Sequence, residues 1–382
     1  MKDKIRVLHI LPSLGKGGAE RLVLNICSEL LQNPEFEVKL ITFREENKFK
    51  DLSKNINREV CNSKYIPSIF GKSIVEIENL KKVISEYKPD IIHSHLFESE
   101  IVSRKIIYPD IIYITHLHDN MIQFQNFSVR AIFNKKLAAN YYEKLLMLKK
   151  YRECKNNFIA ISNDTNEYFT NCLPRDLQRI TLIHNAINFE FFFNPGKKSI
   201  SKDQKINLVS IGSLVEKKNQ IFLVDIVKIL IDKGYNVHLD ILGEGINRAK
   251  IENKINNYNL NQSIHLRGNV DNVAEYLKNS SIYLHSATYE PFGLVLIEAM
   301  AAGLPCIALD GKGNRDIIVN ETNGFMISDE NTQLFAEKII YLIKNPDLYG
   351  KMSESAKEFS KKYDIKKYVN TLLEYYKNLL AK

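Results

Sequence analysis

The sequence predicts an α/β protein built from two doubly wound, Rossmann-like domains. Short apolar runs rich in β-branched residues alternate with amphipathic helical segments along nearly the whole chain. These runs are apolar throughout rather than alternating in polarity, which is typical of parallel strands covered by helices on both faces. The length of 382 residues gives room for about two to three domains of ordinary size.

The expected strands and helices alternate as in a doubly wound sheet. In the first half of the chain, strands are expected at residues 5–11, 38–43, 91–96, 111–117, 158–161 and 180–184. In the second half, strands are expected at residues 207–211, 237–242, 264–266, 282–285 and 306–309.

A polar segment, residues 194–205, separates the two series of strands. It contains Pro195 and Gly196, and its composition is typical of a linker. We therefore place the first domain at residues 1–195 and the second at residues 196–362. The remainder, residues 363–382, is expected to form a final amphipathic helix.

Composition excludes several classes of protein. Hydrophobic residues make up 45% and charged residues 26%, so the chain is neither a disordered protein nor a coiled coil. No apolar stretch reaches the length of a membrane span or a signal peptide, so we expect a soluble, cytoplasmic protein. The five cysteines are scattered and predict neither disulfides nor a zinc site. The net charge of +8 suits small anionic ligands or an anionic membrane, and we expect no nucleic-acid partner.

The first expected strand is followed by a glycine-rich turn. Gly17 and Gly18 lie in it, just before a helix expected at residues 21–31. Glycines at such a turn let backbone N–H groups approach an anion, although a tight turn alone would also need them. A dinucleotide-binding fingerprint requires a third glycine where this chain has Glu20, so binding of NAD is disfavoured.

The most informative segment follows the strand at residues 282–285. Glu290 and Pro291 precede a short expected helix, and its first free amides can hold a phosphate. These amides lie around Phe292, Gly293 and Leu294. Glu298 follows eight residues after Glu290, so two carboxylates can flank the phosphate and accept hydrogen bonds from diols. As isolated residues, the two glutamates would be solvated surface groups.

The segment Glu290-Pro-Phe-Gly-Leu-Val-Leu-Ile-Glu298-Ala-Met-Ala-Ala-Gly-Leu-Pro resembles the paired-glutamate signature of glycosyltransferase family 4. This family contains retaining enzymes of the GT-B fold that use nucleotide-sugar donors. Gly17-Gly18-Ala-Glu20 resembles its glycine-rich loop, and Gly212-Ser213-Leu-Val-Glu-Lys217-Lys218 resembles its phosphate-binding loop. Arg267-Gly268 also matches in order and spacing, so the resemblance covers the whole chain.

The resemblance implies two Rossmann-like domains that face each other across a cleft, with the C-terminal helix crossing back to the first domain. The first domain would bind the acceptor, and the second would bind the nucleotide sugar. Glu290 would contact the transferred sugar, and Lys218 would neutralise the diphosphate. Where the family most often has arginine, this chain has Ser213, and Lys217 and Arg315 are candidate replacements. The expected donor-binding residues are Gly17, Gly18, Gly212, Ser213, Lys218, Arg267, Glu290, Phe292, Gly293, Leu294 and Glu298.

Histidines gather at the ends of two expected strands of the first domain. His116 and His118 follow the strand at residues 111–117, and either could bind a sugar hydroxyl or be incidental to a helix N-cap at Asp119. Alignment with the family favours His118 as a catalytic residue, together with Glu290 and Lys218. His93 and His95 resemble half of a metal site, but no carboxylate or cysteine partner is evident. No Asp-x-Asp motif occurs, so we expect no metal and no cofactor.

The sequence also predicts a basic helical surface at residues 130–155. This stretch has eight basic and two acidic side chains. A helical stripe of apolar residues runs along it, comprising Ile132, Phe133, Leu137, Tyr141, Leu145 and Leu148. Such a helix can bind an anionic membrane, or it can pack on the sheet with a solvated basic face.

The resemblance to glycosyltransferase family 4 implies a retaining glycosyltransferase that moves a sugar from a UDP- or GDP-sugar to a hydroxyl group. The acceptor would be a glycan or a lipid-linked sugar in the synthesis of surface polysaccharide or glycolipid. The enzyme would lie in the cytoplasm or peripherally on the inner face of the cell membrane. Two alternatives are a non-catalytic GT-B paralogue that binds a partner and an NAD-dependent oxidoreductase.

Overall fold

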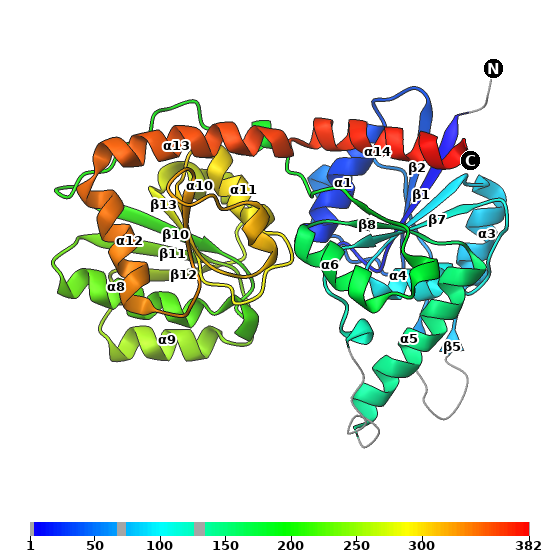
Figure 1. Cartoon of the computed structure of the whole chain (residues 1–382), viewed down its shortest axis with the longest axis horizontal. Coiled ribbons are helices and arrows are strands. Elements are labelled where there is room, and N and C mark those ends of the chain that lie inside the picture. Colours follow the sequence, from blue (N-terminus) through cyan, green and yellow to red (C-terminus); the bar gives the residue numbers. More distant parts are fainter. Residues whose placement is uncertain (1–3, 67–73, 126–133, 382) are drawn as a thin grey trace. The chain divides into compact units, whose positions relative to one another are not determined.

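The computed structural model describes residues 4–66, 74–125 and 134–381 (Figure 1). The chain divides into two compact units. Unit 1 comprises Met1–Ala186 together with Ile365–Lys382, and unit 2 comprises Ile187–Asp364. The boundary expected after residue 195 therefore lies a few residues inside unit 2, and the C-terminal helix belongs to unit 1.

Unit 1 is built on a seven-stranded sheet in the order β3-β2-β1-β6-β7-β8-β9. Every pairing between these strands is parallel. The strands are β1 (Ile5–Leu11), β2 (Phe36–Thr42), β3 (Arg58–Val60), β6 (Ile91–His95), β7 (Ile112–Leu117), β8 (Asn157–Ala160) and β9 (Ile180–Leu182). A separate antiparallel pair consists of β4 (Tyr65–Ile66) and β5 (Ile74–Val75).

Helices cover both faces of this sheet. Helices α1 (Gly18–Leu30) and α14 (Ile365–Leu380) share one hydrophobic core with the strand residues of one face. The opposite face packs against α3 (Glu78–Tyr87), α4 (Phe97–Ser103), α5 (Lys135–Glu153) and α6 (Asn163–Cys172). A short helix, α2 (Lys50–Ser53), lies between β2 and β3. Burial from both sides explains why the strands are apolar throughout.

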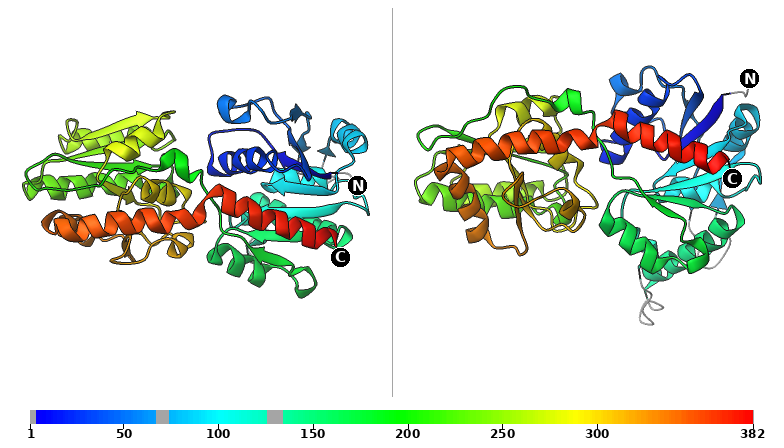
Figure 2. Two further views of the ribbon diagram at one scale, coloured as in Figure 1. Left: turned by 90° about the horizontal axis from the view of Figure 1, so that it is seen from above. Right: turned by 45° about the horizontal axis from the view of Figure 1, so that its top comes forward.

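Unit 2 repeats this architecture with a six-stranded parallel sheet in the order β12-β11-β10-β13-β14-β15. Its strands are β10 (Ile206–Ile211), β11 (Val237–Leu242), β12 (Ile264–Gly268), β13 (Ile282–His285), β14 (Cys306–Leu309) and β15 (Gly324–Ile327). Its helices are α7 (Phe189–Phe192), α8 (Gln220–Asp232), α9 (Arg248–Asn257), α10 (Val273–Asn279), α11 (Leu294–Ala301), α12 (Thr332–Lys344) and α13 (Pro346–Ser360). Figure 2 shows both units from two further directions.

These findings confirm the predicted fold class of two doubly wound α/β units. The strands expected at 5–11, 237–242, 282–285 and 306–309 coincide with β1, β11, β13 and β14. The sequence analysis missed β3, β4, β5 and β15, which are short or lie at sheet edges. Within the described ranges, no helix is both long and apolar enough to cross a membrane.

Candidate active site

Three loops meet at the carboxyl edge of the unit 2 sheet, because β10, β13 and β14 are neighbours there. The loop after β13 is held to the loop after β10 by a hydrogen bond from the Thr288 amide to the Lys217 carbonyl, 3.0 Å long. It is held to the loop after β14 by the Glu290 amide, which donates to the Gly311 carbonyl at 2.8 Å. Ligands of open α/β sheets bind at this edge.

Buried Glu290 and partly buried Lys218 form an ion pair between two of these loops. Nζ of Lys218 lies 2.6 Å from Oε2 of Glu290, and the Glu290 residue is 8% exposed. Nε2 of His285, at the end of β13, lies 3.3 Å from the same oxygen. Burial by itself raises the pKa of Glu290, but the Lys218 ammonium and His285 outweigh burial and lower this pKa to about 2. Glu290 is therefore a carboxylate at neutral pH.

Helix α11 begins beside this pair. Gly293 is its N-cap and has a φ of 103°, a left-handed conformation that favours glycine. The first amides of the helix have no intrahelical partner and can donate to an anion. The Phe292 ring is buried and packs edge-on against Tyr363, so its side chain is part of the core of unit 2 and does not face a ligand. Glu298 lies one turn into the helix and is 5% exposed.

The two candidate replacements for the family arginine already have partners. Arg315 forms a two-pronged ion pair with Asp310, with Nε and Nη2 lying 2.9 and 2.7 Å from the carboxylate oxygens. Nζ of Lys217 lies 5.5 Å from the centre of the Tyr289 ring. Ser213 is exposed, and its carbonyl accepts a hydrogen bond from Gln220 at 3.0 Å. Lys218, in contrast, forms its ion pair with Glu290 itself.

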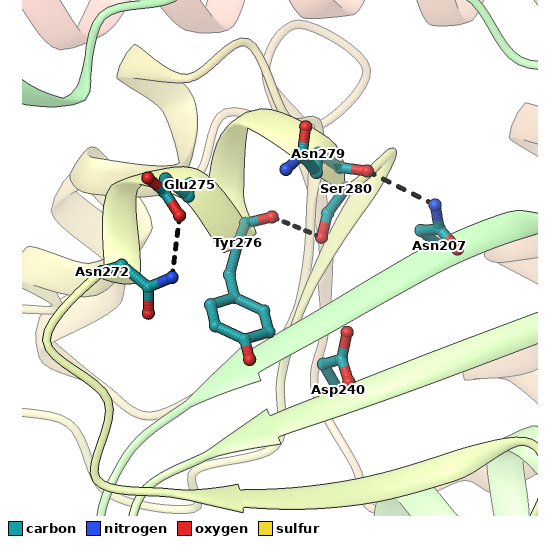
Figure 3. A pocket seen from close by; sticks show the side chains of 7 residues that line it. All are labelled: Asn207, Asp240, Asn272, Glu275, Tyr276, Asn279 and Ser280. Carbon is teal, nitrogen blue, oxygen red and sulfur yellow. Dashed lines mark hydrogen bonds between the residues drawn. The ribbon is translucent and has the colours of Figure 1, made fainter.

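Arg267 lies apart from this group of loops. It lies on β12, at the sheet edge and two strands from β10, and its Nε lies 2.6 Å from Oδ1 of Asp240. Asp240 in turn lines a separate polar pocket of about 240 Å³ with Asn207, Asn272, Glu275, Tyr276, Asn279 and Ser280 (Figure 3). The structure therefore places Arg267 with Asp240 and not with Glu290.

The side-chain carboxylate of Glu20 occupies the space beside the glycine-rich turn of unit 1. Gly17 is the N-cap of α1, and a Cβ atom at this position would lie 2.2 Å from Oε2 of Glu20. Burial raises the pKa of Glu20, and the nearby Glu46 carboxylate adds a smaller increase. A backbone hydrogen bond partly offsets this rise. The glycine at position 17 thus makes room for Glu20, and binding of an anion by Gly17 and Gly18 stays a prediction.

Five histidines form a stack on the α1 face of the unit 1 sheet: His9, His93, His95, His116 and His118. They lie on or just after β1, β6 and β7, and strand register pairs His9 with His93 and His95 with His116. Neighbouring ring centres are 4.3 to 5.2 Å apart. Nδ1 of His93 lies 2.6 Å from the Tyr376 hydroxyl of α14. Burial lowers the pKa of all five rings, so they are neutral at pH 7.

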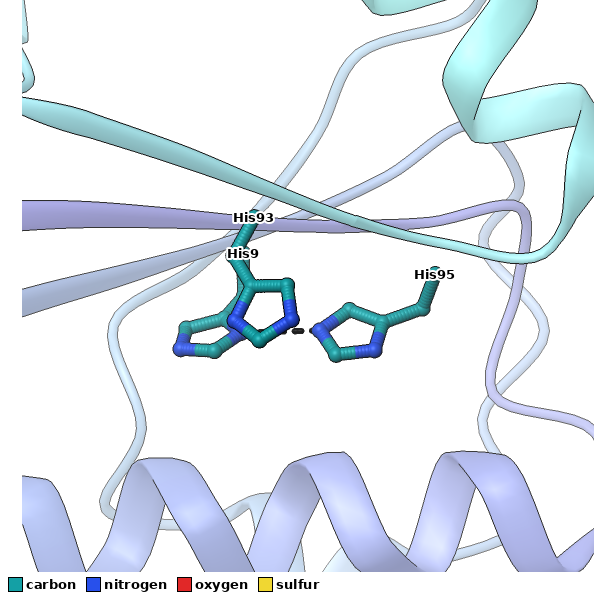
Figure 4. A group of neighbouring side chains, drawn as sticks. All are labelled: His9, His93 and His95. Atoms are coloured by element: carbon teal, nitrogen blue, oxygen red, sulfur yellow. Dashed lines mark hydrogen bonds between the residues drawn. The ribbon is translucent and has the colours of Figure 1, made fainter. Parts of the chain in front are cut away.

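Ring nitrogens of two histidine triplets, each including His95, lie within 4.8 Å of one another, as a shared metal ion would require. Two of the nitrogen pairs, however, are only 2.9 Å apart, which is a hydrogen bond through one proton (Figure 4 shows the pair between His9 and His95). A metal ion would have to replace these bonds. In a third group, His238, Asp240 and His265, the Arg267 guanidinium already bonds Asp240 and His265. The histidines of unit 1 are therefore arranged as a stack linked by hydrogen bonds.

The sequence analysis missed His9 and His285. His9 sits within an apolar strand, where its polar character among Val7 and Leu11 was the available signal. His285 ends β13 and could have been noticed as the strand residue nearest the glutamate motif. Both become informative only when the strand order places them beside other polar groups.

Two family models together match nearly the whole chain. The model described as Glycosyltransferase Family 4 matches residues 16–191. The model described as Glycosyl transferases group 1 matches residues 193–359. The two matches meet close to the boundary between the units.

Similar proteins are also glycosyltransferases. An uncharacterized glycosyltransferase of Methanocaldococcus jannaschii is 29% identical over 95% of both chains. The UDP-Gal:alpha-D-GlcNAc-diphosphoundecaprenol alpha-1,3-galactosyltransferase of Escherichia coli is 25% identical over 88% of both chains. Among solved structures, Anabaena HepE in complex with UDP and glucose has a TM-score of 0.78 and 18% identity, over 98% of this chain and 99% of that chain.

Proposed function

The chain belongs to the group 1 glycosyl transferases of family 4 and has the GT-B fold, and on this premise we propose that it transfers a sugar from a nucleoside diphosphate to a hydroxyl group, with retention at the anomeric carbon. The observation that carries the proposal is the ion pair of Glu290 and Lys218 beside the N-terminus of α11. These groups offer a carboxylate, an ammonium and free amides within one site. A sugar diphosphate has complementary hydroxyl and phosphate groups.

The proposed reaction assigns a role to each group. A diphosphate at the α11 amides would draw the Lys218 ammonium toward its oxygens, and this positive charge would stabilise the departing diphosphate. The Glu290 carboxylate would accept hydrogen bonds from hydroxyls of the transferred sugar, and Glu298 would do so from the ribose. The acceptor oxygen forms a bond to the anomeric carbon as the bond to the diphosphate oxygen breaks. The hydroxyl proton passes to the departing diphosphate.

Similar proteins support this choice of substrates. The name of the Escherichia coli relative specifies a UDP-galactose donor and an acceptor linked to diphosphoundecaprenol. The HepE structure contains UDP and glucose. We therefore propose a UDP- or GDP-sugar as donor and a glycan or lipid-linked sugar as acceptor, in the synthesis of polysaccharide or glycolipid. Neither the NAD-dependent nor the non-catalytic alternative gains support from these matches.

A ligand panel and a product assay test the proposal. Thermal unfolding is measured with UDP, GDP, CMP and NAD, since a ligand at 100 times its Kd stabilises the folded protein by about 2.7 kcal/mol. The nucleotide that stabilises the protein is then supplied as its sugar conjugates, and the anomeric configuration of the product is determined by NMR. Stabilisation by NAD alone would contradict the proposal, and an inverted product would contradict retention.

We further propose that unit 1 binds the inner face of an anionic membrane through α5. Leu137 and Leu145 of this helix are 41% and 50% exposed, and Tyr141 between them is 37% exposed. Figure 1 shows the first half of α5 extending away from the sheet of unit 1. Of the stripe expected from the sequence, Ile132 and Phe133 lie outside the described residues, as does Arg130. Leu148 is buried, so the exposed apolar residues of this stripe end at Leu145.

A further inference from the structure

Three histidines of the stack are joined end to end by hydrogen bonds. Nδ1 of His9 lies 2.9 Å from Nε2 of His95, and Nδ1 of His95 lies 2.9 Å from Nε2 of His118. His9 and His95 have no exposed surface, whereas His118 is partly exposed. The series therefore leads from the interior of unit 1 to the carboxyl edge of its sheet, where β7 ends.

The proton positions on the three rings are coupled. Burial lowers the pKa of each of these histidines, so each ring is neutral and carries one N–H and one lone pair. His95 uses both nitrogens in the two hydrogen bonds, one as donor and one as acceptor. Only two arrangements satisfy both bonds: all three donors point toward His118, or all three point toward His9.

The buried end of the series decides between the two arrangements. Nε2 of His9 is buried and has no hydrogen-bond partner in the described part of the chain. Donors pointing toward His118 leave a lone pair at this atom, whereas the reverse leaves an N–H there. Buried N–H groups without an acceptor are rarer in proteins than acceptors that lack a donor. The first arrangement is therefore favoured, and His118 carries its proton on Nδ1.

We propose that His9 and His95 are positioning residues that fix the ring orientation and the tautomer of His118, so that His118 offers an Nδ1–H donor to an oxygen of the bound sugar or acceptor. This inference rests on the proposed function, and on the expectation from the family resemblance that His118 contacts the bound sugar or the acceptor. Nδ1 of His118 has no hydrogen-bond partner among the residues described by the structure. In this form His118 donates a hydrogen bond, and it has no lone pair on Nδ1 with which to remove a proton from the acceptor hydroxyl.

The tautomer is measured without any substrate. In the full-length protein labelled with ¹⁵N-histidine, long-range ¹H–¹⁵N spectra distinguish protonated from unprotonated ring nitrogens, and the His118 signals are assigned by their loss in His118→Gln. We expect Nδ1 of His118 to be protonated and Nε2 to be unprotonated. In His95→Phe, which keeps a ring in the stack but removes both bonds, His118 should become a mixture of tautomers.

His93→Phe is the matched control. The His93 ring stacks on His95 at a centroid distance of 4.4 Å, but its hydrogen bond goes to Tyr376 and not into the series. The His118 spectrum should therefore be unchanged in this variant. A protonated Nε2 on His118 in the wild type would overturn the proposal, and so would a His118 spectrum that is the same in His95→Phe as in the wild type.

Transfer kinetics test the positioning role. His95→Phe should lower kcat about three- to tenfold and leave the KM for the nucleotide sugar unchanged, because one oriented hydrogen bond is lost. His95→Asn should recover most of this loss, since its side-chain amide can still donate toward His118. A kcat of His95→Phe equal to that of the wild type would show that His95 does not position His118 for transfer. If the wild-type protein transfers no sugar at all, the proposed function fails, while the tautomer measurement is judged on its own.

Discussion

Lys218 illustrates what residue identity alone can and cannot reveal. The resemblance to glycosyltransferase family 4 implies that it neutralises the diphosphate, because it matches the lysine of the family's phosphate-binding loop. The structure adds that it pairs with Glu290, which lies 72 residues further along the chain. Only the adjacency of β10 and β13 brings the two together, and a sequence motif does not encode strand order.

We predict that Lys218→Ala weakens binding of UDP, or of GDP if that is the preferred nucleotide, far more than binding of the matching nucleoside. A charged hydrogen bond contributes about 1.5–3 kcal/mol, or roughly a 10- to 150-fold change in Kd, and the nucleoside has no phosphate to lose it. Isothermal titration calorimetry measures both affinities. Lys217→Ala is the control, since this neighbouring lysine lies over Tyr289. Equal losses for nucleotide and nucleoside would show that Lys218 does not bind the diphosphate.

Glu290→Gln and Glu298→Gln should each lower sugar transfer by about one to two orders of magnitude while the protein stays folded. Both replacements keep the volume of the side chain but remove the negative charge that accepts hydrogen bonds from hydroxyls. The initial rate of transfer is compared with that of Glu216→Gln, an exposed glutamate in the loop after β10. Full activity of both variants would show that neither glutamate contributes to sugar transfer.

At the scale of elements, the strands were easier to predict than their ends or their neighbours. The apolar runs of β1, β11, β13 and β14 stand out because helices cover both faces of these strands. Strand β15, Gly-Phe-Met-Ile, is as short as β13 and β14, but it lies at the sheet edge and begins with glycine, which is depleted in strands. Strand β3 is the polar tripeptide Arg-Glu-Val at the opposite edge of unit 1. Edge strands depend on a single neighbour and so leave a weaker sequence signal.

Helix α5 gives a prediction at this scale. Converting Lys135 and Lys136 to Glu should reduce sedimentation with anionic liposomes, because each basic residue near such a surface contributes about 1 kcal/mol. Converting Lys233 and Lys351, two exposed lysines of unit 2, to Glu changes the net charge by the same amount. This control should have little effect on sedimentation with the liposomes. Wild-type binding should weaken in 1 M salt, where the Debye length is about 3 Å. Equal sedimentation of the wild type with neutral and anionic vesicles would leave α5 as an ordinary packing helix.

For the molecule as a whole, the uneven distribution of buried histidines predicts that the two units respond differently to acid. In unit 1, burial lowers the pKa of His9 and His116 to about 3 and also lowers that of the three other stacked rings. The unfolded chain binds protons at these histidines below about pH 6.5, whereas the folded unit does not. Unfolding is therefore favoured as the pH falls. In the same unit, burial raises the pKa of Glu100 to about 7. The folded state therefore binds one proton at this carboxyl at a pH where the unfolded chain does not, and this proton partly offsets the effect of the histidines.

The expected change is large enough to measure in each unit separately. Each histidine that stays neutral lowers the free energy of unfolding by about 1.4 kcal/mol per pH unit below pH 6.5. Hydrogen exchange followed by mass spectrometry, corrected for the intrinsic effect of pH, should show protection of β1, β6 and β7 falling by several kcal/mol between pH 7 and pH 5.5. The unit 2 strands β10 and β13 should change less, because in unit 2 burial lowers the pKa of a single described histidine, His238, against the opposing charge of Asp240. The pKa of Glu290 is lowered to about 2, so its carboxylate stays ionised in this range. His116→Phe keeps an aromatic ring in the stack and removes one titrating group. Unfolding of unit 1 should then take up about one proton fewer, so its free energy of unfolding should depend less steeply on pH. Equal pH dependence in the two units would show that the stack is not neutral in the folded protein.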